Sequence, residues 1–274
     1  WTSMDYLGEA GIAYVCYGDE KRNIRKYPWR TAYCGDIDIC GFKRPQSYYR
    51  DCVWDIAEKP YIAVHPPEHY GETPGMTAWS WVDVQPSWEW PGFEGKPIKI
   101  DVYCSNSEVE LFLNGKSLGR KPAGKKEKYI ASFDTRYQAG ELIAVAYENG
   151  KEKSRKIIKT AGKSYGLRLT PDRNKLKAVS GDLSYIIVEV VDKEGNLVHT
   201  AENNIYFTVY GEGKLIAIGN SDPMSEESFV GNHHKAYNGR AMAVLCSNGN
   251  TGKIILTAVA DGFRPVEVII TVGD

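Results

Sequence analysis

Aromatic rings next to carboxylates are the clearest chemical signal in this sequence. Asp5 and Glu9 follow Trp1, and Asp36 and Asp38 follow Gly35 in a loop rich in aromatic residues. A sugar offers an apolar C–H face on which a ring can stack, and its hydroxyl groups hydrogen-bond to carboxylates. Both segments are therefore candidates for contact with a carbohydrate.

A second group of aromatic residues lies further along the chain. Four tryptophans are set among prolines, namely Trp79, Trp81, Trp88 and Trp90. Such a group suits either a platform for carbohydrate or a packed domain interface, and composition alone favours the interface. All seven tryptophans lie in the first third of the chain, so the two alternatives concern its N-terminal part.

Metal chemistry is not indicated by the histidines. His65 and His69 have the spacing of a helical metal pair, but two prolines between them prevent a continuous helix. His233 and His234 are adjacent and would point to opposite sides of a strand. We expect no metal site and no cofactor.

The other common reaction centres are also missing from the sequence. No Ser or Cys has a recognisable catalytic partner, and neither GxGxxG nor GxxxxGK[ST] occurs, which gives no support to a serine nucleophile or a phosphate loop. The lysines at 125–128 and 151–159 lack interleaved aromatic residues, so we read them as solvated and edge-strand residues and expect no nucleic-acid partner. Glu226 and Glu227 are expected in a solvated loop.

Composition and charge limit the possible classes of protein. The 274 residues carry 34 basic and 35 acidic side chains, and 42% are hydrophobic. No stretch approaches the roughly 18 apolar residues of a membrane span, so we expect none. Six scattered cysteines form no CxxC pair and are expected to be mostly buried thiols; they are Cys16, Cys34, Cys40, Cys52, Cys104 and Cys246.

The elements that must position these residues change character along the chain. Helical spacing predicts a helix that begins at Pro45 and ends before Pro60, after a strand end near residues 1–7. From Tyr61 the period becomes two, and Asn114-Gly115 and Asn149-Gly150 predict hairpin turns. Residues 61–160 are expected to form an antiparallel sandwich, and residues 162–164 a joint.

Seven further strands are expected after the joint, which is typical of an immunoglobulin-like sandwich without its cysteine pair. They are residues 166–169, 184–191, 204–210, 215–218, 241–247, 253–260 and 266–272. The fold class is therefore mainly β, with two antiparallel immunoglobulin-like β-sandwich domains after a short α/β segment.

The order of several motifs resembles the C-terminal part of glycoside hydrolase family 2, which includes bacterial β-galactosidases and β-glucuronidases. The motifs are residues 1–9 (WTSMDYLGE), 33–38, 41–45, 79–81, 87–92, 109–119 (VELFLNGKSLG), 219–223 and 237–240. The resemblance implies that residues 1–60 are the C-terminal end of a (β/α)8 TIM barrel, with its last strand, loop and helix. Residues 61–162 and 163–274 would be the two sandwich domains.

What the resemblance implies for chemistry is a parent enzyme that hydrolyses β-glycosidic bonds with retention. Such enzymes use two glutamates, and both would lie upstream of Trp1, so no catalytic residue is expected here and the piece alone should be inactive. Trp1 would face the sugar at the C-terminal face of the barrel, with Asp5 and Asp36 as further substrate-binding candidates. The partner would be a β-linked oligosaccharide.

Two rival interpretations accompany this one. One sandwich is a carbohydrate-binding module, or the second is a purely structural immunoglobulin-like domain. One strand and one helix cannot close a barrel, so we expect residues 1–60 to be the least ordered part or a contact in a homo-oligomer. A periplasmic or secreted location is expected from the resemblance alone.

Overall fold

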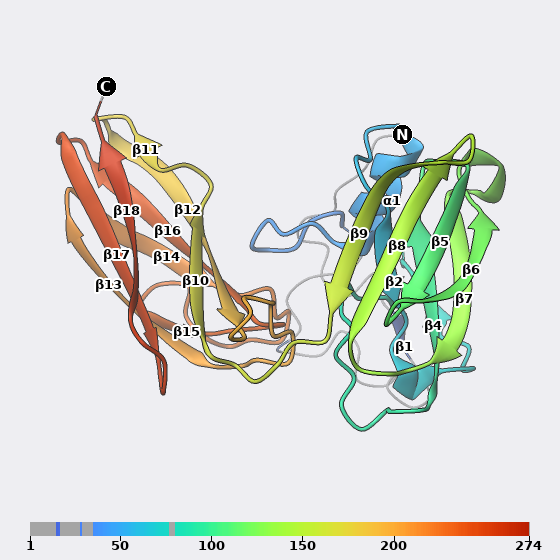
Figure 1. Cartoon of the computed structure of the whole chain (residues 1–274). Coiled ribbons are helices and arrows are strands. Elements are labelled where there is room, and N and C mark those ends of the chain that lie inside the picture. Colours follow the sequence, from blue (N-terminus) through green and yellow to red (C-terminus); the bar gives the residue numbers. More distant parts are fainter. Residues whose placement is uncertain (1–14, 17–27, 29–34, 77–79, 274) are drawn as a thin grey trace. The chain divides into compact units, whose positions relative to one another are not determined.

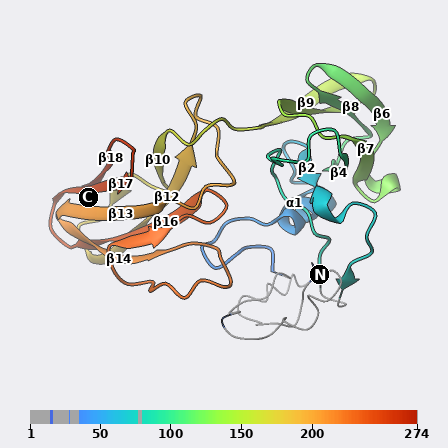
Figure 2. The ribbon, with the colours of Figure 1, turned by 90° about the horizontal axis from the view of Figure 1, so that it is seen from below.

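The computed structural model describes residues 15–16, 28, 35–76 and 80–273, and it is mainly β. The chain divides into two compact units, residues 1–160 and 161–274. Figures 1 and 2 show β-sheet in both units and one α-helix, α1, beside strand β2. No helix in the described part is long and apolar enough to cross a membrane.

The first unit is built on a sandwich of two antiparallel sheets. One sheet has the order β2-β4-β7, and the other has the order β6-β5-β8-β9. The strands are β2 (Tyr61–Val64), β4 (Pro97–Tyr103), β5 (Glu108–Leu113), β6 (Lys116–Pro122), β7 (Ile130–Arg136), β8 (Glu141–Glu148) and β9 (Lys151–Lys159). Two short strands, β1 (Val15–Cys16) and β3 (Gly75–Met76), pair separately.

Both predicted hairpin turns of this unit are confirmed. Asn114 and Gly115 have φ of 50° and 79°, and Asn149 and Gly150 have φ of 52° and 76°. Positive φ at both central residues matches the right-handed twist of the flanking strands. The Asn114 side chain also bonds to Ala139 O and to the Glu141 N–H, which fixes this turn to the start of β8.

Helix α1 (Pro45–Val53) begins at Pro45, as predicted, but it ends earlier than expected. The helical pattern predicted continuation to residue 59. Instead Asp55 has φ of 57°, and the N–H groups of Ile56 and Ala57 both bond to Asp51 O. The left-handed residue turns the chain back over the last helical turn, so the apolar spacing of Ile56 and Ala57 reflects a return loop.

Aromatic packing fixes α1 to the outer face of the β2-β4-β7 sheet. Tyr48 stacks on Tyr61 at 4.2 Å, and Tyr61 stacks on Tyr103 at 5.7 Å. Cys52 of α1 is buried in the same cluster. A helix with one apolar side must bury it against another element, and here the first sandwich supplies that surface.

The second unit is a sandwich of a four-stranded sheet, β10-β12-β16-β14, and a five-stranded sheet, β11-β18-β17-β13-β15. Its strands are β10 (Gly166–Pro171), β11 (Lys175–Leu176), β12 (Ser180–Val191), β13 (Asn204–Gly211), β14 (Gly213–Gly219), β15 (His233–Lys235), β16 (Arg240–Asn248), β17 (Gly252–Ala260) and β18 (Val266–Val272). All seven predicted strands are present. Only the β11–β18 pair among the described strands is parallel.

The two units have different cores. Trp88, Trp90, Phe133 and Tyr137 lie in the core of the first, together with aliphatic side chains. The core of the second is almost entirely aliphatic, with Phe207 as its buried aromatic residue. Four cysteines are free thiols, with Cys52, Cys104 and Cys246 buried and Cys40 half-buried.

Candidate functional site

Asp36 is the predicted substrate-binding residue that the structure describes. Its carboxylate is buried and paired with Arg50 of α1. Gln46 Nε2 donates to Gly35 O at 2.7 Å, and the Arg44 N–H donates to Asp36 O at 2.8 Å. These contacts attach the loop to the start of the helix, so Asp36 here joins loop to helix.

The other acidic residue of this loop is also occupied locally. Asp38 Oδ1 accepts the backbone N–H groups of Cys40 and Phe42 at 2.9 and 3.0 Å. It therefore stabilises the turn that leads into α1. Trp1, Asp5, Glu9 and Trp79 lie outside the described residues, as does the strand expected near residues 1–7.

The three described tryptophans of the predicted platform or interface are packed inside the first unit. Trp88 is fully buried, its Nε1 donates to Gln138 O at 3.0 Å, and its ring meets Tyr137 edge-on at 5.0 Å. Trp90 is 8% exposed. Neither ring has a free face on which a sugar could stack.

Trp81 lies in the aromatic cluster under α1. Its Nε1 donates to Tyr103 Oη at 3.2 Å, and its ring contacts Tyr49 at 5.0 Å. Burial raises the pKa of Tyr103 well above its ordinary value, although the Trp81 hydrogen bond opposes the shift. Tyr103 is therefore a neutral hydroxyl that accepts from the indole.

A polar centre that sequence reasoning missed lies on the same outer face of the β2-β4-β7 sheet. His65 Nε2 is 2.7 Å from Asp101 Oδ2, and Ser132 Oγ donates to Asp101 Oδ1 at 2.5 Å. The carboxylate is 6% exposed. Burial opposes its ionisation, but the His65 and Ser132 hydrogen bonds and the charge of nearby Lys99 outweigh burial and lower the pKa of Asp101.

The geometry of this centre does not suit nucleophilic catalysis. Asp101 lies between the serine and the histidine, whereas a nucleophile needs its general base within direct hydrogen-bond reach. Asp101 of β4 instead links Ser132 of β7 to His65, the residue after β2, and these partners lie 31 and 36 residues away in sequence. No local motif signals such a contact, so only the strand register could have revealed it.

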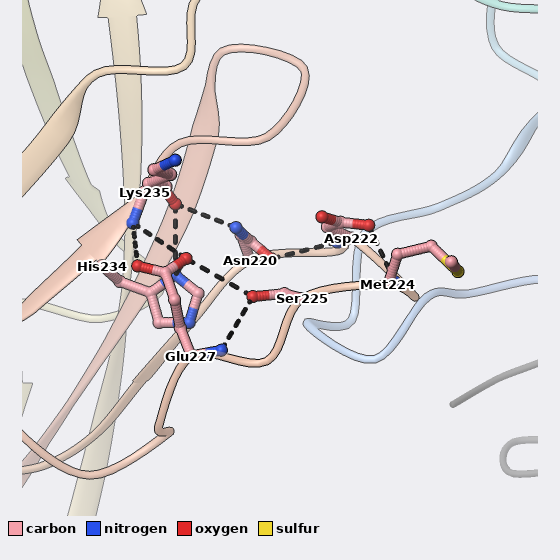
Figure 3. A network of polar contacts seen from close by, with 7 residues as sticks. All are labelled: Asn220, Asp222, Met224, Ser225, Glu227, His234 and Lys235. Carbon is pink, nitrogen blue, oxygen red and sulfur yellow. Dashed lines mark hydrogen bonds and ion pairs between the residues drawn. The ribbon is translucent and has the colours of Figure 1, made fainter. Parts of the chain in front are cut away.

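The second unit carries a more extended polar network in the loop between β14 and β15 (Figure 3). Asn220 is buried, its Nδ2 donates to Lys235 O at 3.0 Å, and its Oδ1 accepts the Asp222 N–H at 3.1 Å. Asp222 Oδ1 then accepts the Met224 N–H at 2.8 Å. The loop is thus folded back on itself and tied to β15.

Glu227 connects the far side of this loop to the same strand. Its Oε1 accepts the Lys235 N–H at 3.1 Å, and its Oε2 lies 3.3 Å from His234 Nδ1. Its side chain is 29% exposed. The expectation of a freely solvated Glu227 is therefore wrong, because β15 offers it a backbone donor and an imidazole.

His234 and His233 point to opposite sides of β15, as their adjacency predicted. His234 is fully buried, and Phe229 lies parallel to its ring at 6.3 Å. His233 is exposed and stacks on Tyr206 at 5.5 Å. Among the described residues no group of three or more His, Cys, Asp or Glu side chains could hold a metal ion.

Comparisons with known proteins agree with this architecture. Residues 167–269 match the glycoside hydrolase family 2 C-terminal domain 5, and residues 95–154 match a domain of unknown function, DUF4982. The chain is 34% identical over 267 residues to a β-galactosidase, BoGH2A, of Bacteroides ovatus, which covers 96% of this chain. The chain belongs to glycoside hydrolase family 2, in its C-terminal part.

Solved structures of family 2 support the assignment over the whole chain. A family 2 glycosyl hydrolase from Bacteroides cellulosilyticus is 37% identical, with a TM-score of 0.87 over 100% of this chain. A putative β-glucuronidase of Formosa agariphila is 29% identical over 230 residues. The chain spans 27% of the length of the first of these relatives, 36% of the second and 19% of the third.

Proposed function

We propose that this chain supplies the C-terminal accessory region of a retaining β-glycosidase of the β-galactosidase type. The observation that carries the proposal is the similarity over the whole chain to a family 2 hydrolase of much greater length, at a TM-score of 0.87. The relatives named β-galactosidase and β-glucuronidase point to a β-linked glycoside as the substrate of the whole enzyme.

In this proposal the two catalytic glutamates precede Trp1, and residues 1–60 complete a catalytic barrel. Retaining glycosidases place these two carboxyl groups about 5–5.5 Å apart. Trp1 and Asp5 would line the sugar site at the end of the last barrel strand. The pairing of Asp36 with Arg50 suits a residue that shapes the loop beside that site.

The two sandwiches would act as supports for the barrel. The packing of α1 on the first sandwich through Tyr48, Tyr61 and Cys52 favours this role, because it joins the proposed barrel tail to the sandwich. Burial of Trp88 and Trp90 argues against a tryptophan platform for carbohydrate in the first sandwich.

The test compares this chain with the same chain extended upstream to include the barrel. We expect the 274-residue chain to leave 4-nitrophenyl β-galactoside and 4-nitrophenyl β-glucuronide unchanged. The extended protein should cleave at least one of them and give the β-anomer first, as seen by proton NMR. An extended protein with both glutamates changed to glutamine is the control.

Two results would contradict the proposal. Hydrolysis by the 274-residue chain would place the catalytic groups inside it. An extended, folded protein without activity on either glycoside would remove the link to β-galactosidase-type chemistry.

A further inference from the structure

The outer face of the five-stranded sheet in the second unit exposes aromatic side chains that nothing in the described residues covers. Strand β13 alternates between the core and solvent: Ile205 and Phe207 are buried, whereas Tyr206 is 41% exposed and Tyr210 is 65% exposed. Figure 1 shows β13, β17 and β18 running through this sheet. Two exposed aromatic side chains on one sheet face make this face a candidate binding surface.

Strand register arranges this face in three rows. The first row is His233, Tyr206 and Val259, and the third is Tyr210, Ile255 and Ile269. The row between them is polar and consists of Thr208, Thr257 and Glu267. Tyr206 and Tyr210 are four residues apart on one strand, which separates their Cα atoms by about 13 Å.

We propose that this face binds a short β-linked oligosaccharide. Tyr206 and Tyr210 act as the stacking surfaces for two sugar rings, and the polar row between them bonds to the sugar hydroxyl groups. The inference deepens the proposed function and rests on it for the chemical class of the ligand. It adds a binding face in the second sandwich, separate from the hydrolytic site of the whole enzyme.

A neighbouring ring holds one of the two tyrosines, Tyr206, in a form that suits stacking. His233 lies against Tyr206 at 5.5 Å with an interplanar angle of 24°, which limits the rotation of the Tyr206 ring. Tyr210 is paired with Ile255 on β17, which is paired in turn with Ile269 on β18. The cross-strand neighbours of Tyr210 on this row are therefore apolar. Rings fixed before binding lose less conformational entropy when a ligand arrives.

The polar middle row favours a sugar over an apolar protein partner as the ligand of this face. Thr257 Oγ1 donates to Glu267 Oε1 at 3.0 Å, and no ion pair to Glu267 occurs among the described side chains. An apolar partner that covered this row would strip water from a carboxylate that has one hydroxyl donor and no ion pair, which is costly. Sugar hydroxyl groups would instead replace the lost water as hydrogen-bond donors.

The other sheet of the same unit provides an internal contrast. Its outer face also has an exposed tyrosine, Tyr185, at 43%. The acidic residue of that face, Glu189, is held by Arg168 at 2.7 Å and by Arg240 at 3.0 Å. Glu189 therefore has its acceptor sites occupied by guanidinium groups, and Tyr185 serves as a matched control.

The test measures binding of soluble oligosaccharides to the 274-residue chain. The probes are β-1,4-galactotetraose, cellotetraose and β-1,3-glucotetraose, and isothermal titration calorimetry measures the Kd of each. We expect at least one to bind, and Tyr206→Ala and Tyr210→Ala each to weaken its Kd by about ten-fold or more, the equivalent of losing one stacked ring. Glu267→Gln should weaken it about three-fold or more, because a charged acceptor is the stronger partner.

Two substitutions serve as controls. Tyr206→Phe should keep the stacking and the affinity, and Tyr185→Ala should leave the Kd unchanged. Absence of binding by all three probes at millimolar concentration would overturn the inference. The inference would also be overturned if the Tyr206→Ala and Tyr210→Ala chains bound the oligosaccharide with the same Kd as the unsubstituted chain. A dimer in sedimentation equilibrium that these two substitutions dissociate would overturn it as well.

The binding test and the hydrolysis test fail independently. Tyrosine-dependent binding by the 274-residue chain with no activity of the extended protein would keep this face and remove the proposed hydrolase. Activity of the extended protein with no tyrosine-dependent binding would keep the proposed hydrolase and remove this binding face.

Discussion

The two sandwiches treat their aromatic residues in opposite ways. The first places Trp88 and Trp90 in its core and covers the aromatic end of one outer face with α1. The second has an almost wholly aliphatic core and leaves Tyr206 and Tyr210 on an uncovered outer face. Aromatic side chains thus supply stability in one unit and accessible surface in the other.

The largest expected effect comes from removing a core ring of the first unit. Trp88→Ala should lower the free energy of unfolding by about 3–5 kcal/mol, because it leaves a large cavity and frees the Gln138 carbonyl. Urea unfolding monitored by circular dichroism measures this. Trp54→Ala is the matched control, since Trp54 is 45% exposed, and its cost should stay below about 1 kcal/mol. Equal costs would contradict the burial contrast.

In each unit a carboxylate with low exposure ties strands together, Asp101 in the first and the half-buried Glu189 in the second, which makes a second comparison. Asp101→Asn in the first unit and Glu189→Gln in the second should each cost about 1–3 kcal/mol, because partners lose a charged acceptor. Asp134→Asn, at an exposed position on β7, should cost far less. If Asp101→Asn or Glu189→Gln left the free energy of unfolding almost unchanged, the hydrogen bonds or ion pairs of that carboxylate would not stabilise its unit.

Acid should affect the second unit first. Burial and the positive charge of Arg240 lower the pKa of His199 to about 4, against the opposing charge of Glu189. A lowered histidine pKa means that the unfolded chain takes up the proton first, so stability falls as pH decreases from the ordinary value of 6.5 towards 4. Allowing for residual exposure, the loss is about 1–2 kcal/mol.

The pKa of Asp101 in the first unit is lowered instead, so its contribution is complete above the ordinary value of 3.8 and is lost below it. Chemical denaturation at pH 7, 5.5 and 4.5 tests this order. His199→Gln should flatten the pH dependence of the second unit. An unchanged dependence in that variant would exclude His199 as the cause.

The smallest expected effect compares two turns of the same type. Asn114→Ala should cost about 1–2 kcal/mol, since Asn114 has a positive φ and two side-chain hydrogen bonds. Asn149→Ala, at a turn with the same backbone, should cost about 0.5–1 kcal/mol. Thermal unfolding would separate the two. The close approach of Asn114 Oδ1 to Gly140 also means that a side chain at position 140 would displace Asn114.

Local patterns accounted for much of the fold. The Asn-Gly turns, seven of the nine strands of the second unit and the start of α1 each follow from a few adjacent residues, and the structure has them where the sequence predicted them. The end of α1 differed, because a single left-handed residue, Asp55, redirected an apolar pattern that still had helical spacing.

Contacts between distant residues could not be predicted in the same way. Asp101 meets His65 and Ser132 only through strand register, and Glu227 meets His234 only because the β14–β15 loop folds back onto β15. The tyrosine face was missed for a related reason. Its residues come from four strands, and all the tryptophans, the stronger aromatic signal in the sequence, lie in the other unit.

The parallel pairing of β11 with β18 bears on mechanical behaviour. Two backbone hydrogen bonds, from Thr271 to Asn174 and from Gly273 to Leu176, join this pair, and the Leu176 side chain is buried beneath it. Tension drawn along the chain would pull these neighbouring parallel strands in opposite directions and load both bonds together. Antiparallel neighbours at a hairpin would instead open one bond at a time. Once β10, which precedes β11 in the chain, has detached from β12, the β11–β18 pair would therefore bear the load in shear.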